Sequence, residues 1–339
     1  MRKEVTLKDL AKMANLSANT ISCALNGKPG VSQETRERVL RLADEYNYRP
    51  NMMARSMRGA RTKMFGVLVG DITDVFFVEL LSGVEEVARK ESMVIMIGNT
   101  NNDPKQEAEG LDTLLSYQCE NIIITPTGVD CQILEKLRNA GVNYAIADRT
   151  YDGVMGYNQV SIDNRQDAVD AVQYLVNCGH TRIAICNQFS DIPTETDRTA
   201  GYRDALADND ILIRPEYEMF IKKKSDIPTA CRALMALPEP PTAVFIAKDT
   251  LSMQVVSALT EMGLGIPDDV SVVIYGCPEW SQAFRPHITC MLRPVSEVGR
   301  IAAELIMDDI RASNSARSNS ACIKLKSVLM EKDSVKRLR

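Results

Sequence analysis

Residue types and motifs on which many catalytic sites depend are scarce in this sequence. Its 339 residues include only two histidines, His180 and His287, and its nine cysteines form no Cys-x-x-Cys pair. Zinc clusters and multi-histidine active sites are therefore nearly excluded, and the odd number of scattered cysteines indicates reduced thiols rather than a disulfide framework. No G-x-G-x-x-G, G-x-x-x-x-G-K-[ST] or G-x-S-x-G motif follows an expected strand. We expect no enzyme activity, no metal and no cofactor.

Long apolar segments are also missing. No run approaches the roughly 18 to 20 residues of a membrane span, and the first residues, MRKEVTLKDLAKMANLS, contain no secretory hydrophobic stretch. We therefore expect a cytoplasmic protein with no membrane partner. At roughly 100 to 200 residues per domain, the length predicts two or three domains. The hydrophobic share of 45% is typical of globular chains, which bury substantial cores.

The net charge of −5 hides an uneven distribution. Residues 1–63 contain 13 Lys and Arg against 6 Asp and Glu, a balance of +7, whereas the other 276 residues contain 27 against 39, a balance of −12. A locally positive segment attracts phosphates whatever the total charge, so this distribution is typical of nucleic-acid binding. A solvated basic tail is the alternative, but such a tail would lack the periodic apolar positions found here.

Three short helices are expected within residues 1–50. Thr6 and Asp9 begin the first, LKDLAKMA; Ser17 caps the second, ANTISCAL; and Ser32 caps the third, QETRERVLRLADEY. A turn of about three residues joins the first two helices, which is typical of a helix-turn-helix. The second helix would then place its N-terminal residues in the DNA major groove. A generic three-helix packing module is the alternative.

The expected DNA contacts lie on and around this second helix. Ala18, Asn19 and Ser22 are candidates for contacts to base edges, and Thr20 for a phosphate or base contact. Asn19 has both the donor and the acceptor needed to bond adenine bidentately, whereas Ala18 offers only an apolar contact. The remaining candidates in this segment are Thr6, Ser17 and Asn26.

Residues 51–62 are predicted to form a hinge. Asn51 caps a brief segment, MMARSMRG, that is too short to remain helical alone in water. Met57 would provide an apolar wedge for the minor groove, with Arg55 and its neighbours along the phosphates. We expect this segment to fold only on DNA. A flexible linker with incidental methionines is the alternative.

The remaining chain alternates strand and helix patterns. Seven β-branched runs are expected to be strands: 65–70, 93–98, 121–125, 142–148, 182–186, 243–247 and 270–275. Because helical stretches lie between several of them, we predict an α/β body with two doubly wound parallel sheets, the first ending near Ser161. Ligands of such sheets bind beyond the carboxyl ends of the strands, where Thr125, Asp148, Arg149 and Asp249 are candidates.

The stretch TLKDLAKMANLSANTISCALNGKPGVSQETRERVLRLADEYNYRPNMMARSMRG resembles the headpiece of the LacI/GalR family of bacterial transcription repressors almost position for position. DNRQDAVDAV, CGHTRIAI, RTAGYRDAL, PDDVSVV and RPHIT are similar to landmarks of the family's core. The resemblance implies a homodimer that binds a palindromic double-stranded DNA operator. It also implies a small-molecule effector between two lobes of the type I periplasmic-binding-protein kind. Met57 stands where members usually have leucine, and Cys23 where many have arginine.

The same resemblance implies a domain layout. It places a helix-turn-helix headpiece at residues 1–50 and a hinge helix and linker at residues 51–62. The two lobes are each discontinuous: the N-terminal lobe would comprise residues 63–161 and 293–322, and the C-terminal lobe residues 162–292 and 323–339.

By this resemblance, Phe76 and Phe77 form an apolar wall for the effector, while Asp148, Arg198 and Asp249 provide polar contacts. Arg198 is the strongest single candidate, because it lies three residues before Gly201 as the family's ligand-binding arginine does. A surface arginine at the start of a helix is the alternative.

Two departures from the family pattern bear on the ligand. Lys248 replaces a usual asparagine, and the loop after Tyr275 lacks a frequent acid. Arg149, Arg198 and Lys248 would together favour an anionic or phosphorylated ligand if all three face the cleft. Lys248 pointing to solvent is the alternative. Trp280 is expected either to stack on the ligand or to pack within a lobe.

A ligand-responsive DNA-binding regulator, most simply a repressor, accounts for all of these features. A periplasmic binding protein accounts for the body alone, and an enzyme lacks a catalytic constellation. The effector class is a sugar, a sugar phosphate or a related metabolite. The effector is either an inducer or a corepressor. Both fit, because one equilibrium between open and closed lobes can either weaken or strengthen DNA binding.

Overall fold

The computed structural model describes residues 5–49, 62–127, 132–149, 156–189, 192–312 and 320–338. The chain divides into two compact units, residues 1–62 and 63–339. No helix among the described residues is long and apolar enough to cross a membrane.

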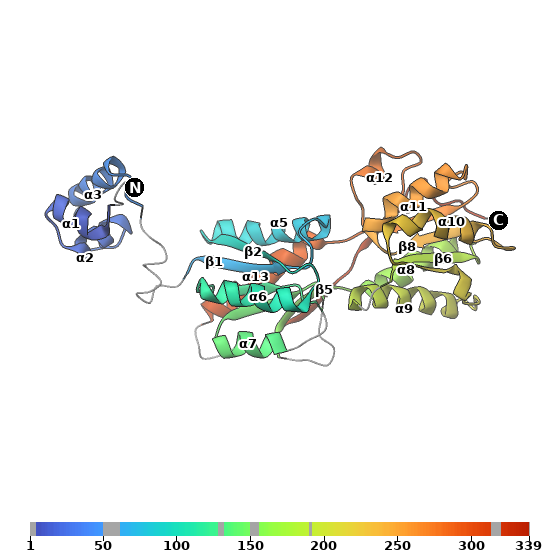
Figure 1. The fold of residues 1–339 in the computed structure, drawn as a ribbon, viewed down its shortest axis with the longest axis horizontal. Coiled ribbons are helices and arrows are strands. Elements are labelled where there is room, and N and C mark those ends of the chain that lie inside the picture. Colours follow the sequence, from blue (N-terminus) through green and yellow to red (C-terminus); the bar gives the residue numbers. More distant parts are fainter. Residues whose placement is uncertain are drawn as a thin grey trace. The chain divides into compact units, whose positions relative to one another are not determined.

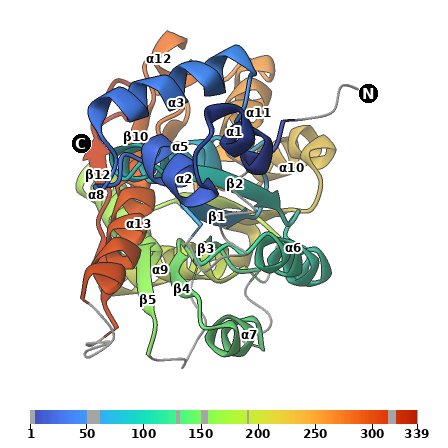
Figure 2. The same cartoon turned by 90° about the vertical axis from the view of Figure 1, so that its left-hand side faces the viewer.

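The N-terminal unit contains the three expected helices, α1 (Leu7–Ala14), α2 (Ala18–Leu25) and α3 (Gln33–Glu45), which pack around one small core (Figures 1 and 2). Leu10, Ile21 and Val39, one from each helix, are fully buried at its centre. The turn between α1 and α2 depends on Asn15, whose φ of 51° is in the left-handed region that asparagine tolerates. The predicted helix-turn-helix arrangement is confirmed.

The N-terminal lobe of the body is built on a six-stranded parallel sheet with the order β11-β5-β4-β3-β1-β2. Its strands are β1 (Met64–Val69), β2 (Val94–Asn99), β3 (Asn121–Ile124), β4 (Asn143–Ala147), β5 (Asn158–Ile162) and β11 (Cys322–Leu325). Helices α5 (Val75–Lys90) and α13 (Val295–Arg311) cover one face, and α6 (Pro104–Ser116) and α7 (Gln132–Ala140) cover the other (Figure 1).

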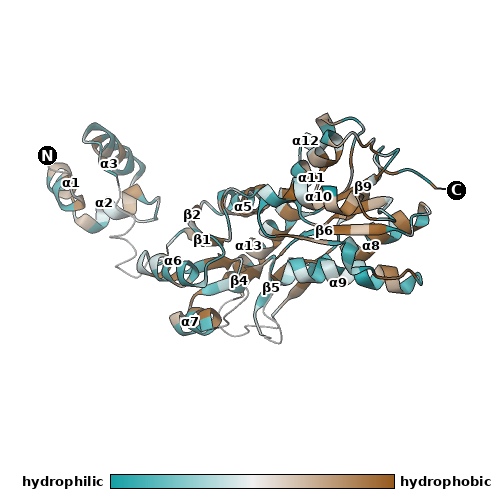
Figure 3. Ribbon diagram, turned by 45° about the vertical axis from the view of Figure 1, so that its right-hand side comes forward, coloured by the Kyte–Doolittle hydropathy of each residue, from teal (hydrophilic) through white to brown (hydrophobic). Residues whose placement is uncertain are grey.

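The C-terminal lobe repeats this plan with the order β12-β10-β9-β8-β6-β7. Its strands are β6 (Ile183–Gln188), β7 (Glu218–Ile221), β8 (Ala243–Ile246), β9 (Ser271–Tyr275), β10 (Thr289–Leu292) and β12 (Val328–Met330). Helices α8 (Asn164–Asn177) and α9 (Pro193–Asp208) cover one face; α10 (Ile227–Met235), α11 (Asp249–Glu261) and the short α12 (Trp280–Ala283) cover the other. Figure 3 shows hydrophobic segments along the strands, as expected for sheets covered on both faces.

The chain passes between the two sheets three times: after Ile162, after Leu292 and after Leu325. The predicted pair of doubly wound sheets is confirmed, with β12 as an antiparallel exception beside β10. The last passage differs from the expected boundary after Cys322, because β11 pairs with β5 as far as Leu325 and so stays in the N-terminal sheet. Ile323, Lys324 and Leu325 therefore belong with that sheet.

Helices α5 and α13 approach each other closely enough for their backbones to touch. A Cβ placed on Gly83 of α5 would lie 1.8 Å from the Ser296 carbonyl oxygen, and one on Gly299 of α13 would lie 2.0 Å from the Leu80 carbonyl oxygen. Neither neighbour is a flexible side chain that could move aside. This contact joins a segment that follows β1 to one that follows β10, so it fixes where the second interlobe passage enters the N-terminal lobe.

Gly83→Ala should destabilise the body although alanine is the better helix former. Alanine gains about 1 kcal/mol of helix propensity over glycine, but overpacking against a backbone typically costs about 1–3 kcal/mol, and more where nothing can yield. We expect the free energy of unfolding in urea to fall. Ser82→Ala, at the exposed neighbouring position, is the matched control and should leave it nearly unchanged. A Gly83→Ala protein as stable as wild type would show that the helices are not in contact.

Candidate DNA-binding and effector sites

Helix α2 presents its first residues to solvent. Ser17 forms the N-cap, where its Oγ accepts a hydrogen bond from the Thr20 backbone amide at 3.0 Å. Ala18 and Asn19 are exposed, whereas Thr20 and Ser22 are half-buried. The first turn of α2 carries no acidic residue. The amide of Asn19 is therefore open to an external partner, and no carboxylate of that turn would repel a phosphate.

Besides Ser17, two more of the predicted DNA-contacting side chains are engaged at helix ends. The Thr6 hydroxyl donates to the Asp9 carboxylate at 2.6 Å and completes a capping box at the start of α1. The Asn26 side-chain amide donates to the Ser22 carbonyl at 2.6 Å at the end of α2. The hinge candidates Asn51, Arg55 and Met57 lie outside the described residues.

A buried group of charges lies where the two lobes meet; we call Asp74, Glu195, Arg198, Lys248, Asp249 and Arg293 the cleft cluster. Glu195 is at its centre, because one carboxylate oxygen lies 3.0 Å from Lys248 Nζ and the other 3.5 Å from Arg198 Nη1. Lys248 also reaches 3.9 Å towards Asp74, which caps α5 in the N-terminal lobe. Lys248 therefore faces the cleft and not the solvent.

Arg293 joins the cluster from the second interlobe passage. Its Nη2 donates to the Asp249 carboxylate, and its guanidinium lies 5.0 Å from the centre of the Phe76 ring. A Cβ on Gly276, whose φ is +96°, would lie 3.0 Å from both Asp249 Cβ and Arg293 Nη2. An acid at this position would press on the Asp249–Arg293 pair and would have to adopt a left-handed conformation that favours glycine.

A second buried network ties the interlobe passages together; we call it the passage network. The Tyr275 hydroxyl lies 2.9 Å from Asp167 Oδ2 and 3.1 Å from Asn164 Oδ1, at the start of α8. Asp167 also accepts a 3.1 Å bond from the Ser327 amide, in the third passage. Arg198 links the network to the cleft cluster, because its Nε donates to Asn164 at 2.9 Å and its guanidinium lies 4.2 Å from the Tyr275 ring centre.

Some donors in this region have no acceptor among the described residues. The bonds of Arg198 use Nε and Nη1, the latter to the Ala247 carbonyl at 2.8 Å, and none is made by Nη2. The buried Nε atoms of Arg293 and Arg149 also lack a hydrogen-bond acceptor in this part of the chain. An unsatisfied buried donor costs roughly 1–3 kcal/mol, so the Nε atoms of Arg293 and Arg149 are suited to a bound oxygen ligand.

Arg149, Asp148 and Thr125 lie at the carboxyl ends of β3 and β4, as predicted. Arg149 Nη1 donates to the Asn102 side chain at 2.6 Å and to the Pro126 carbonyl at 3.2 Å, and its Nε is 3.7 Å from Asp148. The Thr125 hydroxyl donates to the Leu68 carbonyl. Asp148 is buried with a φ of 68°, a strained conformation that brings its carboxylate near the cleft charges.

The carboxylates respond differently to burial. Burial would raise the pKa of Asp249, but the charges of Arg293, Lys248 and Arg198 outweigh it and hold that pKa at about 2. The pKa of Glu195 is likewise lowered, because Arg198 and Lys248 outweigh its burial. At Asp74 and Asp148, burial prevails and raises the pKa.

Each cation of the cleft already has a protein acceptor. The argument from Arg149, Arg198 and Lys248 to an anionic ligand therefore loses its basis, because their charges are compensated within the chain.

The contacts of Trp280 are with its own lobe. It packs edge-on against Phe284, 6.3 Å between ring centres, and against the core between the C-terminal sheet and α10 and α11. Of the two predicted roles, lobe packing agrees with this position.

Two aromatic residues that sequence reasoning missed are Phe189 and Phe220. Both are exposed and line a cavity of about 250 Å³ at the carboxyl ends of β6 and β7, next to Glu195. The signal that could have revealed Phe189 is its place three residues after the predicted strand 182–186. Phe220 lies in β7, which the pattern of β-branched residues did not disclose.

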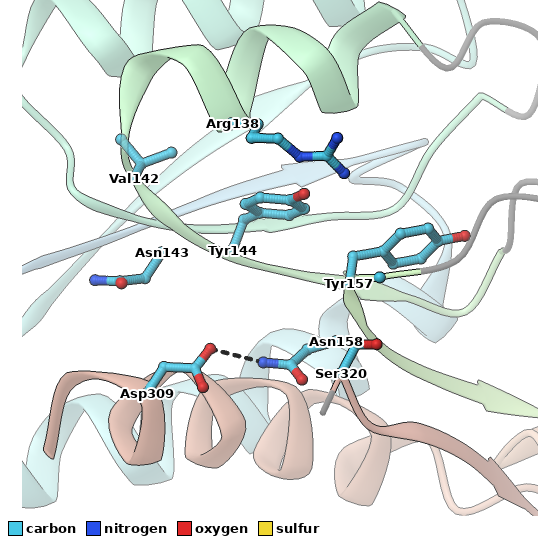
Figure 4. A pocket seen from close by; sticks show the side chains of 9 residues that line it. Arg138, Val142, Asn143, Tyr144, Tyr157, Asn158, Asp309 and Ser320 are labelled. Carbon is cyan, nitrogen blue, oxygen red and sulfur yellow. Dashed lines mark hydrogen bonds between the residues drawn. The ribbon is translucent and has the colours of Figure 1, made fainter. Parts of the chain in front are cut away.

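A second cavity, of about 160 Å³, lies at the other end of the N-terminal lobe, beside the first residues of β4 and β5 (Figure 4). Arg138, Tyr144 and Tyr157 line it, and the Asn158 side chain donates to Asp309 at 2.8 Å across its floor. It adjoins the amino ends of the strands, whereas the cleft cluster adjoins their carboxyl ends. The two are therefore separate sites.

Comparisons with known proteins agree with this architecture. Residues 6–51 match the family model described as bacterial regulatory proteins, lacI family, and residues 172–335 match the model of a periplasmic binding protein-like domain. Catabolite control protein A of Priestia megaterium is 30% identical over 305 residues, which cover 89% of this chain and 91% of that protein. The chain belongs to the LacI family. It is thus a DNA-binding transcription regulator and not an enzyme.

Solved structures of family members share the whole fold. The structure of the transcriptional regulator CelR in complex with cellobiose superposes on this chain with a TM-score of 0.72 and 25% sequence identity. The match covers 97% of this chain and 99% of CelR. The lac repressor dimer bound to operator and the anti-inducer ONPF has a TM-score of 0.86 with 22% identity, and covers 98% and 100%. The predicted family and fold class are confirmed.

Glu195→Gln should destabilise this LacI-family body, because it leaves the buried charges of Arg198 and Lys248 without their shared carboxylate. Breaking a buried ion pair costs about 3–5 kcal/mol. The folded-state pKa of Glu195 lies below its ordinary value of 4.5, so this contribution is complete above that value and is lost as the pH falls through the folded-state pKa. Urea unfolding should show a large difference from wild type near neutral pH that shrinks in acid.

The matched control is Glu239→Gln, which alters an exposed carboxylate paired with Arg214 and should change stability little. A Glu195→Gln protein as stable as wild type near neutral pH would contradict the central position given to Glu195.

Proposed function

We propose that this chain is a cytoplasmic, homodimeric repressor whose operator affinity is set by a sugar or sugar-derived metabolite bound in the cleft. One observation carries the proposal. A helix-turn-helix unit with an exposed recognition helix is joined to a two-lobed core. Charged residues from both lobes of this core meet around arginine N–H groups that have no hydrogen-bond acceptor among the described residues. The first feature serves DNA binding, and the second serves reversible recognition of a ligand rich in oxygen atoms.

For DNA, we propose that α2 enters the major groove and that Asn19 bonds adenine through its side-chain amide. Its exposure at the first turn supports this role. Cys23 is half-buried on the same helix and carries no charge to offer a phosphate or a guanine. Operator preference should therefore differ from that of members with arginine there. Ser17, Thr20 and the basic residues of the headpiece would hold the helix in register on the backbone.

For assembly, we propose a dimer formed through the N-terminal lobe and a palindromic operator that matches its two-fold symmetry. Val75 and Val78 are exposed on α5, Ile72 lies just before them, and Val94 and Ile97 are exposed on the edge strand β2. Helix α5 packs beside β2, so these aliphatic side chains belong to one region of the lobe. Such an apolar region is a frequent site of association.

For the effector, we propose that Arg198 Nη2 and Arg293 Nε donate to ligand oxygens, while Glu195, Asp148 and Asp249 accept from ligand hydroxyls. Sugar hydroxyls both donate and accept, and thus fit a cleft that presents both kinds of group. We also propose that Phe76 and Phe77, whose ring centres lie 5.2 Å apart, form an apolar wall for the ligand. The cellobiose complex of CelR is a relative's example of such a ligand and supports a neutral sugar over an anion.

For regulation, we propose that the ligand changes the balance between lobe arrangements, because the cleft cluster includes Asp74 of one lobe and Lys248 of the other. A ligand shifts such a balance only by the difference in its affinity for the two states. The same cleft supports an inducer or a corepressor, depending on which state holds the headpieces on DNA.

Selection of duplexes from a random-sequence pool by the full-length protein tests the DNA part. We expect an inverted repeat and a binding constant that falls steeply with salt, with a log–log slope near −0.9 per phosphate contacted. Asn19→Ala should relax preference at one base pair of each half-site by about 1–3 kcal/mol. Gln33→Ala, at an exposed position of α3, is the control and should keep the base preference. Enrichment of no sequence, with or without added metabolites, would overturn the proposal.

Calorimetric titration with neutral mono- and disaccharides, sugar acids and sugar phosphates tests the effector part. For the tightest ligand, Arg198→Lys should weaken binding about tenfold or more, because a hydrogen bond from a charged group contributes about 1.5–3 kcal/mol. The control is Arg165→Lys, which replaces an exposed arginine paired with Asp204 on the surface of α8 and should bind as wild type does. If Arg198→Lys bound the ligand as tightly as Arg165→Lys and the wild type do, Arg198 would not be part of the effector site.

A further inference from the structure

The cavity of about 250 Å³ beside Phe189 lies at one margin of the C-terminal sheet, where β7 is the edge strand and β6 is its neighbour. Asn187 of β6 pairs with Phe220 of β7, and the Phe189 amide donates to the Ile221 carbonyl at 2.9 Å, which continues this register. Because side chains alternate along a strand, Phe189 and Phe220 stand on the same face of the sheet. Helix α9 covers that face, since Asn187 Nδ2 donates to the Thr199 hydroxyl at 3.1 Å.

The cavity combines exposed aromatic surface with a polar group that has no partner. Phe189 is 61% exposed and Phe220 38% exposed, so both rings remain available to a ligand. Residues of α9 form the opposite wall: Thr196, Thr199 and Arg203. Gln188 also lines the cavity, and its side-chain amide makes no hydrogen bond with any residue that the structure describes. Apolar walls with a few polar groups are typical of small-molecule sites.

An uncompensated cation lies at this cavity. Lys222 Nζ lies 4.8 Å from the centre of the Phe189 ring, and the Lys222 side chain forms no ion pair within the described part of the chain. The charged side chains of the lining are already paired. Arg203 forms two 2.6 Å bonds with Glu218, and Glu195 is engaged in the cleft cluster. The charge of Lys222 is therefore free to attract an anion, unlike the compensated cations of the cleft.

We propose that this cavity is a second ligand site, separate from the effector cleft, for an aromatic ring that carries an anionic group. The ring packs against Phe189 and Phe220, and its carboxylate or phosphate ester meets Lys222. The Gln188 amide, which both donates and accepts hydrogen bonds, orients polar groups on the ring. Aryl acids and nucleoside monophosphates share this chemistry.

The cavity and the cleft charges lie over different strands. Lys248 and Asp249 follow β8, and Arg293 follows β10, whereas the cavity lies beyond β6 at the β7 edge. Glu195 connects the two, because it lines the cavity while its carboxylate binds Lys248, and its carbonyl accepts a 3.2 Å bond from the Thr199 hydroxyl. A ligand in the cavity thus contacts the turn of α9 that holds the cleft carboxylate. Its effect on effector affinity rests on the proposed function, whereas its binding does not.

Calorimetric titration of the full-length protein with benzoate, phenyl phosphate and adenosine monophosphate tests the site. We expect one of these anions to bind with a dissociation constant below about 1 mM, and its affinity to fall as salt is added. The tightest of the three distinguishes an aryl acid from a nucleotide. Benzyl alcohol has the ring without the charge, and inorganic phosphate the charge without the ring, so each should bind about tenfold more weakly or worse. Equal binding of either, or no binding of the three anions below about 1 mM, would overturn the proposal.

Variants of two exposed side chains locate the ligand. Lys222→Gln should weaken binding of the anion about tenfold and remove its salt dependence. Phe189→Ala should weaken it about three- to tenfold through loss of the ring contact. The matched controls are Lys224→Gln and Leu212→Ala, which alter exposed residues outside the cavity and should bind as wild type does. Wild-type affinity in Lys222→Gln or in Phe189→Ala would contradict the proposed position.

Simultaneous binding distinguishes this site from the cleft. With a sugar effector at saturation, the anion should still bind, and its dissociation constant should reach a plateau as more sugar is added. A dissociation constant that rises in proportion to the sugar concentration would show that the cavity belongs to the effector cleft, and would overturn the separate site. If no sugar binds at all, only the proposed effector function fails, because the titrations with anions do not depend on it.

Discussion

The shared carboxylate of Glu195 is the contact on which the effector site most depends. It compensates two buried cations, Arg198 and Lys248, that come from different segments of the C-terminal lobe. Without it, the buried Arg198 would lose its acidic partner, and desolvation of an unpaired charge costs several kcal/mol. Through Lys248 the pair extends to Asp74 of the other lobe, and through Arg198 it extends to the passage network around Tyr275. One group of charges thus positions the ligand donors and connects both lobes.

The exposed charges of the headpiece and the paired charges of the cleft play different roles in binding. In the headpiece, positive charge remains at the surface, where it is free to attract phosphates. In the cleft, each positive charge is compensated by an acid within the chain, and specificity depends on the few donor atoms left over. A count of cations in the sequence does not separate these cases. Arg149, Arg198 and Lys248 indicated an anionic ligand only while the acids paired with them, above all Glu195, were left out of the charge balance.

Local patterns predicted the headpiece and much of the body. Ser17 and the Thr6–Asp9 pair were predicted as caps, and both are confirmed as capping contacts because caps depend on neighbours within three residues. The seven predicted strands agree with β1–β4, β6, β8 and β9 to within about two residues. Strands β5, β7, β10, β11 and β12 were missed, because they are short and contain no two consecutive β-branched residues. Arg293 was missed for a different reason: it lies in a passage between lobes, and its partner Asp249 is 44 residues away in sequence.

The central claim is that one equilibrium joins the cleft to the DNA-binding unit, and thermodynamic linkage tests it most directly. The dissociation constant of the selected operator is measured with and without the saturating effector, and that of the effector with and without saturating operator. The account predicts that both ratios differ from one and equal each other, at roughly 5- to 150-fold. A ligand that binds the cleft through Arg198 while both ratios stay at one would contradict the account.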